Sequence, residues 1–256
     1  MDMNSVSRRC ALCLALLWAL LPLPARAQDA VSRAADEVLD CGAPEQSVAR
    51  ILAAVLDGRL SHEDGALLLE PLAQACREGL PPAPLAEKAD EGLGKSVPPL
   101  ILRQALDRRL DNLRFAQNLL APRARDGVLP PAALGGLAEA LEAGLPREAL
   151  AGLAQRQPQA PPGMLATAAL VWAYLGRAGL PLADGQSVAD TGLERRSFSS
   201  QWLQFPRLAA QALQKGRTPQ AVREAAVAAL REGAGPSDAA ARLGLTSRSL
   251  ESGPGR

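Results

Sequence analysis

Apolar residues recur at helical spacing along most of the chain. The clearest case is residues 45–56, where Val48, Ile51, Leu52 and Val55 belong to one i, i+3, i+4, i+7 stripe. Similar stripes predict helices over residues 29–41, 61–79, 82–91, 98–120, 131–143, 147–156, 164–177, 206–215, 218–232 and 237–243. The pattern therefore indicates an all-α protein built from short helices.

The tripeptide Gly-Leu-Pro separates these stripes three times, starting at Gly79, Gly144 and Gly179. Glycine adopts the left-handed conformation that ends a helix, leucine folds back over the last turn, and proline suits the first turn of the next helix. We expect stacked short helical hairpins, either as a helical-repeat-like array or as an irregular bundle.

The spacing of these elements predicts how the chain is organised. Residues 28–183 are expected to form a helical hairpin domain, and the 65-residue offset between two of the tripeptides is compatible with a duplicated three-helix unit, or with chance alignment of leucine-rich helices. Residues 184–205 lose helical periodicity and predict an irregular loop or hinge that contains aromatic residues. Residues 206–250 predict C-terminal helices packing on the same domain, followed by a disordered tail over 251–256.

The N-terminal residues predict export. Arg8 and Arg9 precede an apolar run over residues 10–23, and Ala25-Arg26-Ala27 is a small-x-small cleavage site. Residues 1–27 thus resemble a signal peptide, with a mature chain beginning at Gln28 in the periplasm or outside the cell. The alternative is an uncleaved signal anchor. No later stretch has the roughly 20 apolar residues of a membrane span.

Composition argues against several partners and cofactors. The formal charge is +1 for the whole chain and −1 once residues 1–27 are removed, with no basic block, so neither nucleic acid nor anionic lipid is expected to bind. His62 is the sole histidine, which argues against a zinc site or a histidine-based catalytic triad. We expect no metal, no cofactor and no catalytic residue of these types.

Two local motifs suggest nucleotide or DNA binding without the context that either needs. Gly94-Lys95-Ser96 resembles the end of a phosphate-binding loop, but a predicted helix precedes it where that loop requires a strand. Residues 239–250 resemble the turn of bacterial helix-turn-helix DNA-binding domains. That resemblance implies a recognition helix, yet Gly253 and Pro254 truncate the second helix.

Cys41 and Cys76 are the only cysteines after residue 27, and both fall on apolar helix faces. In an oxidising compartment this pair predicts a disulfide, which closes a loop of roughly 36 residues and contributes about 3–4 kcal/mol by chain-entropy arguments. Two free buried thiols, or a redox pair, are the alternative.

Five of the six aromatic residues after residue 27 lie between positions 172 and 205. Aromatic residues and arginine are enriched at interfaces, so this segment is the candidate partner-binding site. Alternatively, the rings fill the core beneath an irregular segment. The candidate residues are Trp172, Tyr174, Arg195, Arg196, Phe198, Trp202 and Phe205.

These observations favour an exported, non-enzymatic protein that binds another protein or an envelope component as an interaction or scaffold module. The alternative is a carboxylate-dependent hydrolase of envelope polymers, and an envelope-assembly chaperone is a third hypothesis. A deep cleft with two acids roughly 5–10 Å apart would favour hydrolysis, whereas a shallow apolar groove would favour binding.

Overall fold

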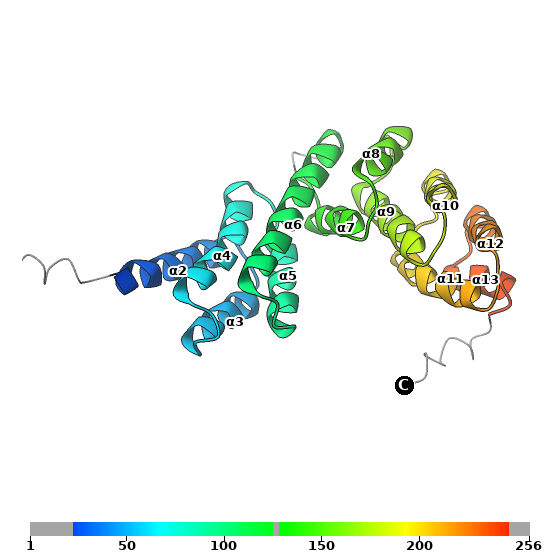
Figure 1. Cartoon of the computed structure of the whole chain (residues 1–256). Helices are drawn as coiled ribbons and strands as arrows, with labels where there is room; N and C mark the ends of the chain where they lie inside the picture. Colours follow the sequence, from blue (N-terminus) through cyan, green and yellow to red (C-terminus); the bar gives the residue numbers. More distant parts are fainter. Residues whose placement is uncertain (1–22, 125–127, 246–256) are drawn as a thin grey trace, which may run out of the picture. The chain divides into compact units, whose positions relative to one another are not determined.

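The structure, a computed structural model, describes residues 23–124 and 128–245 (Figure 1). Within these residues the regular elements are helices, which confirms the all-α prediction, and none is long and apolar enough to cross a membrane. The α-helices are α2 (Leu23–Asp40), α3 (Glu45–Leu56), α4 (His62–Arg77), α5 (Ala83–Gly94), α6 (Pro99–Leu120), α7 (Pro131–Glu142), α8 (Arg147–Arg156), α9 (Pro162–Arg177), α10 (Leu182–Glu194), α11 (Phe205–Gln214), α12 (Pro219–Arg231) and α13 (Pro236–Arg242). Two short 3-10 helices are η1 (Ala121–Arg123) and η2 (Ser200–Gln204).

Left-handed glycines end helices at the predicted corners. The φ angles of Gly79, Gly144 and Gly179 are 66°, 104° and 102°. After the second of these glycines, the amide of Leu145 donates to the carbonyl of Ala140 at 3.1 Å, and the equivalent bond from Leu180 is 3.0 Å long. This is the Schellman arrangement, and it buries both leucines against the helix that they follow.

Two predicted helix starts are also confirmed. Ser61 and Asp64 form a capping box at the start of α4, in which the Asp64 amide donates to Ser61 Oγ at 3.0 Å. At the start of α12, Thr218 Oγ1 accepts the amide of Ala221 at 3.1 Å. Each contact satisfies a backbone donor that the first helical turn would otherwise leave unpaired.

The expected irregular segment over residues 184–205 is helical for half its length, so that prediction is wrong there. Helix α10 covers the first part, and its buried face consists of Gly185, Val188, Ala189, Gly192 and Leu193. Glycine does not register as apolar, so a stripe that includes two glycines escapes detection by periodicity. Only a short connection and η2 separate α10 from α11.

The chain divides into two compact units, where the sequence suggested one domain. Unit 1 comprises the chain up to Glu78 together with Leu85–Leu106, and unit 2 comprises Gly79–Pro84 and the chain from Asp107 onward. Helices α4 and α5 meet at the Gly79 corner and are followed by α6, and helices α7 and α8 meet at the Gly144 corner and are followed by α9. The 65-residue duplication itself stays a prediction.

Unit 1 contains a disulfide that joins the residue directly after α2 to α4. Cys41 and Cys76 are bonded, with their Cα atoms 5.8 Å apart, which confirms the predicted pair. Helix α2 packs along α4, and Arg77 Nη1 lies 2.9 Å from Glu37 Oε1. The disulfide, the ion pair and the apolar contact thus join the same two helices.

Helix α2 starts earlier than the periodicity predicted. It begins at Leu23, where the sequence predicted residue 29, so the proposed cleavage site at residues 25–27 lies within its first turns. Residues 1–22 of the predicted signal peptide lie outside the described residues, as do the predicted tail at 251–256 and the helix-turn-helix resemblance beyond residue 245.

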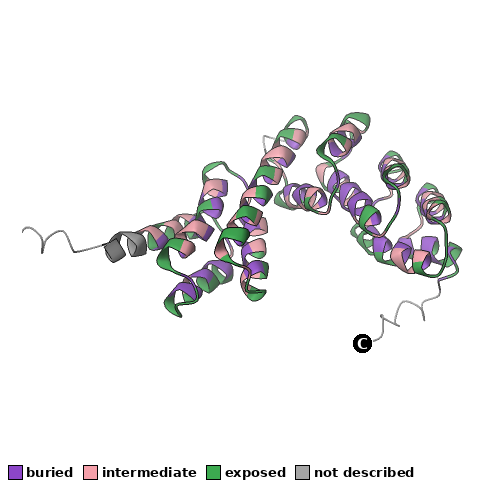
Figure 2. Cartoon of the chain, in the orientation of Figure 1, coloured by how far each residue is buried: buried purple, intermediate pink, exposed green. Residues whose placement is uncertain are grey.

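Unit 2 contains helices α7 to α13. Helix α9 packs against α7 and α10, α10 packs against α12, and α11 contacts both α9 and α13. Buried residues line the faces between neighbouring helices while exposed residues cover the outer faces (Figure 2). The C-terminal helices α11 to α13 therefore belong to the same unit as α7 to α10.

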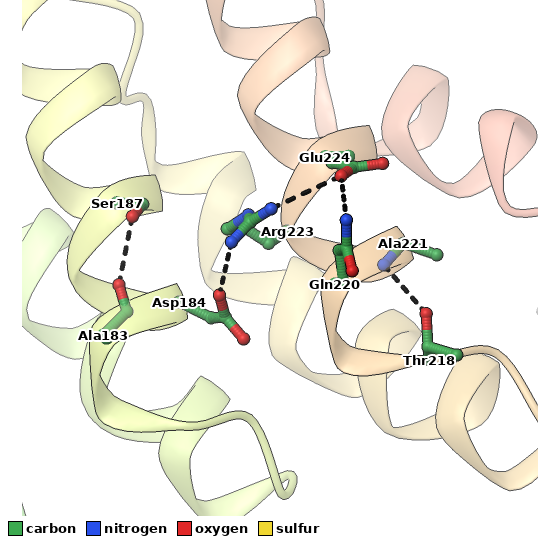
Figure 3. A network of polar contacts seen from close by, with 8 residues as sticks. All are labelled: Ala183, Asp184, Ser187, Thr218, Gln220, Ala221, Arg223 and Glu224. Atoms are coloured by element: carbon green, nitrogen blue, oxygen red, sulfur yellow. Dashed lines mark hydrogen bonds and ion pairs between the residues drawn. The ribbon is translucent and has the colours of Figure 1, made fainter.

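An ion pair links two of these helices. Arg223 Nη1 on α12 lies 2.9 Å from Asp184 Oδ1 on α10, and the Asp184 side chain is only 16% exposed (Figure 3). Glu224 accepts a hydrogen bond from Gln220 at 2.8 Å and lies 3.3 Å from the other end of the Arg223 guanidinium. This network fixes the pairing of α10 with α12 through polar contacts at the helix surfaces.

We expect loss of the disulfide to destabilise unit 1. The double variant Cys41→Ser, Cys76→Ser should lose about 3–4 kcal/mol of unfolding free energy, because the unfolded chain regains the freedom of a loop with a sequence separation of 35. Chemical denaturation followed by circular dichroism measures this loss. Peptide mapping after alkylation without reductant should find neither cysteine labelled, and labelling of both would contradict the bond.

Candidate functional site

The predicted partner-binding rings form a core instead of a surface. Trp172, Trp202 and Phe205 are at most 1% exposed, and Phe198 is 6% exposed. Trp202 packs edge-on against Phe198, with ring centroids 5.9 Å apart, and against Phe205 at 5.4 Å. These four residues are therefore not accessible to a partner in this structure, and they hold η2 against the neighbouring helices.

Two glycines of α10 make room for the rings. A Cβ at Gly185 would overlap the Trp172 indole, and a Cβ at Gly192 would overlap the Phe198 ring. The indole nitrogen of Trp172 donates to the carbonyl of Leu182 at 2.9 Å, so its polar group is satisfied at the start of α10. The packing of Trp172 and Phe198 against α10 thus requires glycine at positions 185 and 192.

The remaining predicted site residues are separated from that core. Arg195 and Arg196 are exposed at the end of α10, where their backbone amides donate to the carbonyls of Thr191 and Leu193, and neither side chain forms a hydrogen bond or ion pair with another described residue. Tyr174 on α9 is half-buried and belongs to a different cluster. The structure does not bring the seven residues together as one site.

Tyr174 belongs to a polar cluster between α7 and α9. Its hydroxyl donates to Glu139 Oε1, and the Arg177 guanidinium lies 5.9 Å from its ring centroid. Burial and the hydrogen bond to Glu139 raise the pKa of Tyr174 to about 12, so the phenol keeps its proton at neutral pH. Chemically this tyrosine is a hydrogen-bond donor and is poorly suited to act as a base.

Arg109 adds a buried cation at the junction of α6 and α7. It is 7% exposed, and its Nη1 lies 3.1 Å from Glu142 Oε2. Arg109 also lies close enough to Tyr174 to oppose the rise in the pKa of the phenol. The Arg109–Glu142 ion pair joins α6 to α7, and the Tyr174–Glu139 hydrogen bond joins α9 to α7, so we interpret the cluster as a structural connection.

An open groove adjoins this cluster, and we call it the corner groove. It has a volume of about 330 Å³ and lies where the corner after α7 faces α9 and the start of α10. Four of its lining residues have no side chain beyond Cβ: Ala143, Gly144, Ala173 and Gly176. Leu145, Leu180, Leu182 and Trp172 supply the remaining apolar surface, and Arg177 is the one charged lining residue.

The corner groove was not predicted from the sequence. Its walls come from two Gly-Leu-Pro corners, which were recognised as turns, and from α9 residues that have no functional signature of their own. Leu182, at 49% exposure, is the most accessible of its large apolar residues. The recurrence of the same tripeptide at Gly144 and Gly179 was the available signal, because residues of both corners line this groove.

Two other cavities in unit 2 have different linings. The larger, of about 690 Å³, is lined by five prolines, and its Arg123 already donates to the carbonyls of Ala154 and Gln157. Burial lowers the pKa of Arg123. The other, of about 320 Å³, contains Glu224 as its only acidic lining residue. None of these three cavities in the described chain is lined by an acid pair.

The other sequence motifs lie on ordinary helix ends. Gly94 ends α5, and Lys95 pairs with Glu91 at 2.6 Å, so a helix does precede this stretch. His62 is exposed in the first turn of α4. Among the residues that the structure describes, no group of three or more His, Cys, Asp or Glu residues could hold a metal ion.

Comparison of the chain with known protein families, with characterised proteins and with solved structures finds no match.

Gly185→Ala should destabilise unit 2 by about 1–3 kcal/mol, because its methyl group would displace a packed indole ring. Gly176→Ala is the matched control, since a Cβ there meets no atom within 4 Å, and removing a helical glycine should stabilise by about 0.5–1 kcal/mol. Urea denaturation of both variants measures the difference. Equal stability of the two would contradict the close contact between α10 and α9.

Alkaline titration should report on Tyr174 alone, since it is the single tyrosine of the chain. Its pKa is raised from 10.0 to about 12 in the folded protein, so the stabilisation is complete below pH 10 and is lost as the pH rises towards 12. Tyrosinate absorbance should show a midpoint near 12 when folded and near 10 in denaturant. Glu139→Gln should lower the folded midpoint, and an unchanged midpoint would contradict the contact.

Proposed function

We propose that this chain is an exported, non-enzymatic protein that binds another protein or an envelope component through unit 2. The observation that carries the proposal is the corner groove, which combines an apolar floor with one charged residue at its edge. Protein interfaces commonly have this composition, with an apolar centre and a polar rim that includes arginine.

Two further observations support export. The basic start, apolar run and small-x-small site of residues 1–27 have the order of a signal peptide. The Cys41–Cys76 disulfide is of a kind that persists in oxidising compartments. Cleavage before Gln28 would remove the first turns of α2 and retain Val31, Ala35 and Val38, three buried residues of this helix.

The stacked hairpins support a scaffold role. The corners between consecutive helices are short and closed by backbone hydrogen bonds, so they allow little rearrangement of the helices that they join. A binding surface made from corners is therefore already formed before a partner arrives, which reduces the entropic cost of association.

Photo-crosslinking in the producing cell tests this proposal. The full-length chain would carry a photoreactive amino acid at Leu182 in the corner groove or at Leu203, an equally large and 40% exposed residue that does not line it. We expect the chain to be recovered outside the cytoplasm with Gln28 at its N-terminus, and to give a discrete adduct from position 182 only. Cytoplasmic retention, or no adduct specific to position 182, would contradict the proposal.

A further inference from the structure

Four of the residues that line the corner groove are alanine or glycine. Ala143, Gly144, Ala173 and Gly176, which we call the floor of the groove, have no side-chain atom beyond Cβ, and a Cβ on Gly176 would meet nothing within 4 Å. A ligand can therefore approach the helix backbone closely at this point. The volume of about 330 Å³ lies at the low end of small-molecule sites and is suited to one or two side chains.

The edge of the groove holds a cation with no anion beside it. Arg177 is exposed and forms no ion pair with any carboxylate in the described chain. Its guanidinium lies over the Tyr174 ring, which orients it without neutralising it. Glu139, an acid of the same cluster, accepts the hydrogen bond from the Tyr174 hydroxyl.

We infer that the corner groove binds an extended peptide segment that places one apolar side chain on the Ala/Gly floor and a carboxylate beside Arg177. This inference rests on the proposed function and adds the chemical class of the ligand. The floor and Leu182 supply the apolar contact, while a guanidinium binds a carboxylate through two parallel hydrogen bonds. The carboxylate is the side chain of an Asp or Glu residue in the peptide, and a peptide C-terminus, which presents the same oxygens, is a separate outcome of the test.

The lining of the groove explains this choice of ligand. Its only charge is positive, so charge complementarity favours an anion. A single cation is too little for nucleic acid or an anionic membrane, whose binding depends on many phosphate contacts or on clustered basic residues. A peptide that joins an apolar group to a carboxylate matches both features of the site.

Selection from a random peptide display library tests the inference without knowledge of the natural partner. The exported protein should enrich peptides in which an apolar residue lies near Asp or Glu. Binding of the selected sequences as synthetic peptides should survive amidation of the C-terminus, and its loss on amidation would overturn the assignment to a side-chain carboxylate. The variant Arg177→Glu should not enrich them, whereas Arg207→Glu, which alters another exposed arginine without ion pairs, should enrich them normally.

Affinity measurements on one enriched peptide then separate charge from shape. Arg177→Glu should weaken binding by about ten- to a hundredfold, the range expected for a charge-assisted hydrogen bond. Replacing the peptide carboxylate by an amide should cost a similar factor, and the two changes together should cost less than the product of both. Full additivity would overturn the proposed contact.

A second pair of variants tests the floor. Gly176→Leu should abolish binding by filling the groove, while Gly94→Leu, at a helical glycine of unit 1 that is equally open, should leave binding unchanged. Failure to enrich any peptide, or enrichment of peptides without a carboxylate, would overturn the inference. If the peptide selection fails but position 182 still gives a crosslinked adduct, the proposed function stands and only the ligand class is wrong. If the selection fails and position 182 gives no adduct, both the ligand class and the proposed function are wrong.

Discussion

The left-handed glycine corner is the constraint on which unit 2 depends. Once a glycine ends a helix, the next amide bonds back across the last turn, and the residue that follows has to lie on the core side of the helix. Leu145 and Leu180 are buried for this reason. The direction of the next helix is then restricted, and residues of the corners after α7 and α9 line the corner groove together.

Much of the fold was predictable because its determinants are local. The glycine corners, the capping box of Ser61 and the proline after Thr218 each depend on a few neighbouring residues. Pairing of Cys41 with Cys76 was predictable because no other cysteine follows the predicted signal peptide. Helix α10 was missed because its packing face includes two glycines. They are needed there because the rings of Trp172 and Phe198, on other segments, pack against them.

The candidate site was harder to predict for a related reason. A concentration of aromatic residues indicates either a core or an interface, and composition does not separate the two. In a chain with few aromatic residues, the large rings are used where alanine and leucine cannot fill space, and Trp202 and Phe205 are buried accordingly. The groove depends on Ala143 and Gly176, small residues that are brought together only by tertiary packing.

Trp172 and Trp202 both lie in unit 2, so their fluorescence reports on that unit separately from unit 1. The third tryptophan, Trp18, precedes Gln28, so a processed chain carries no indole in unit 1. Intrinsic fluorescence of such a chain would follow the melting of unit 2 alone, whereas far-ultraviolet dichroism sums over both units. A difference between the two melting curves would reveal whether the units unfold independently or as one cooperative body.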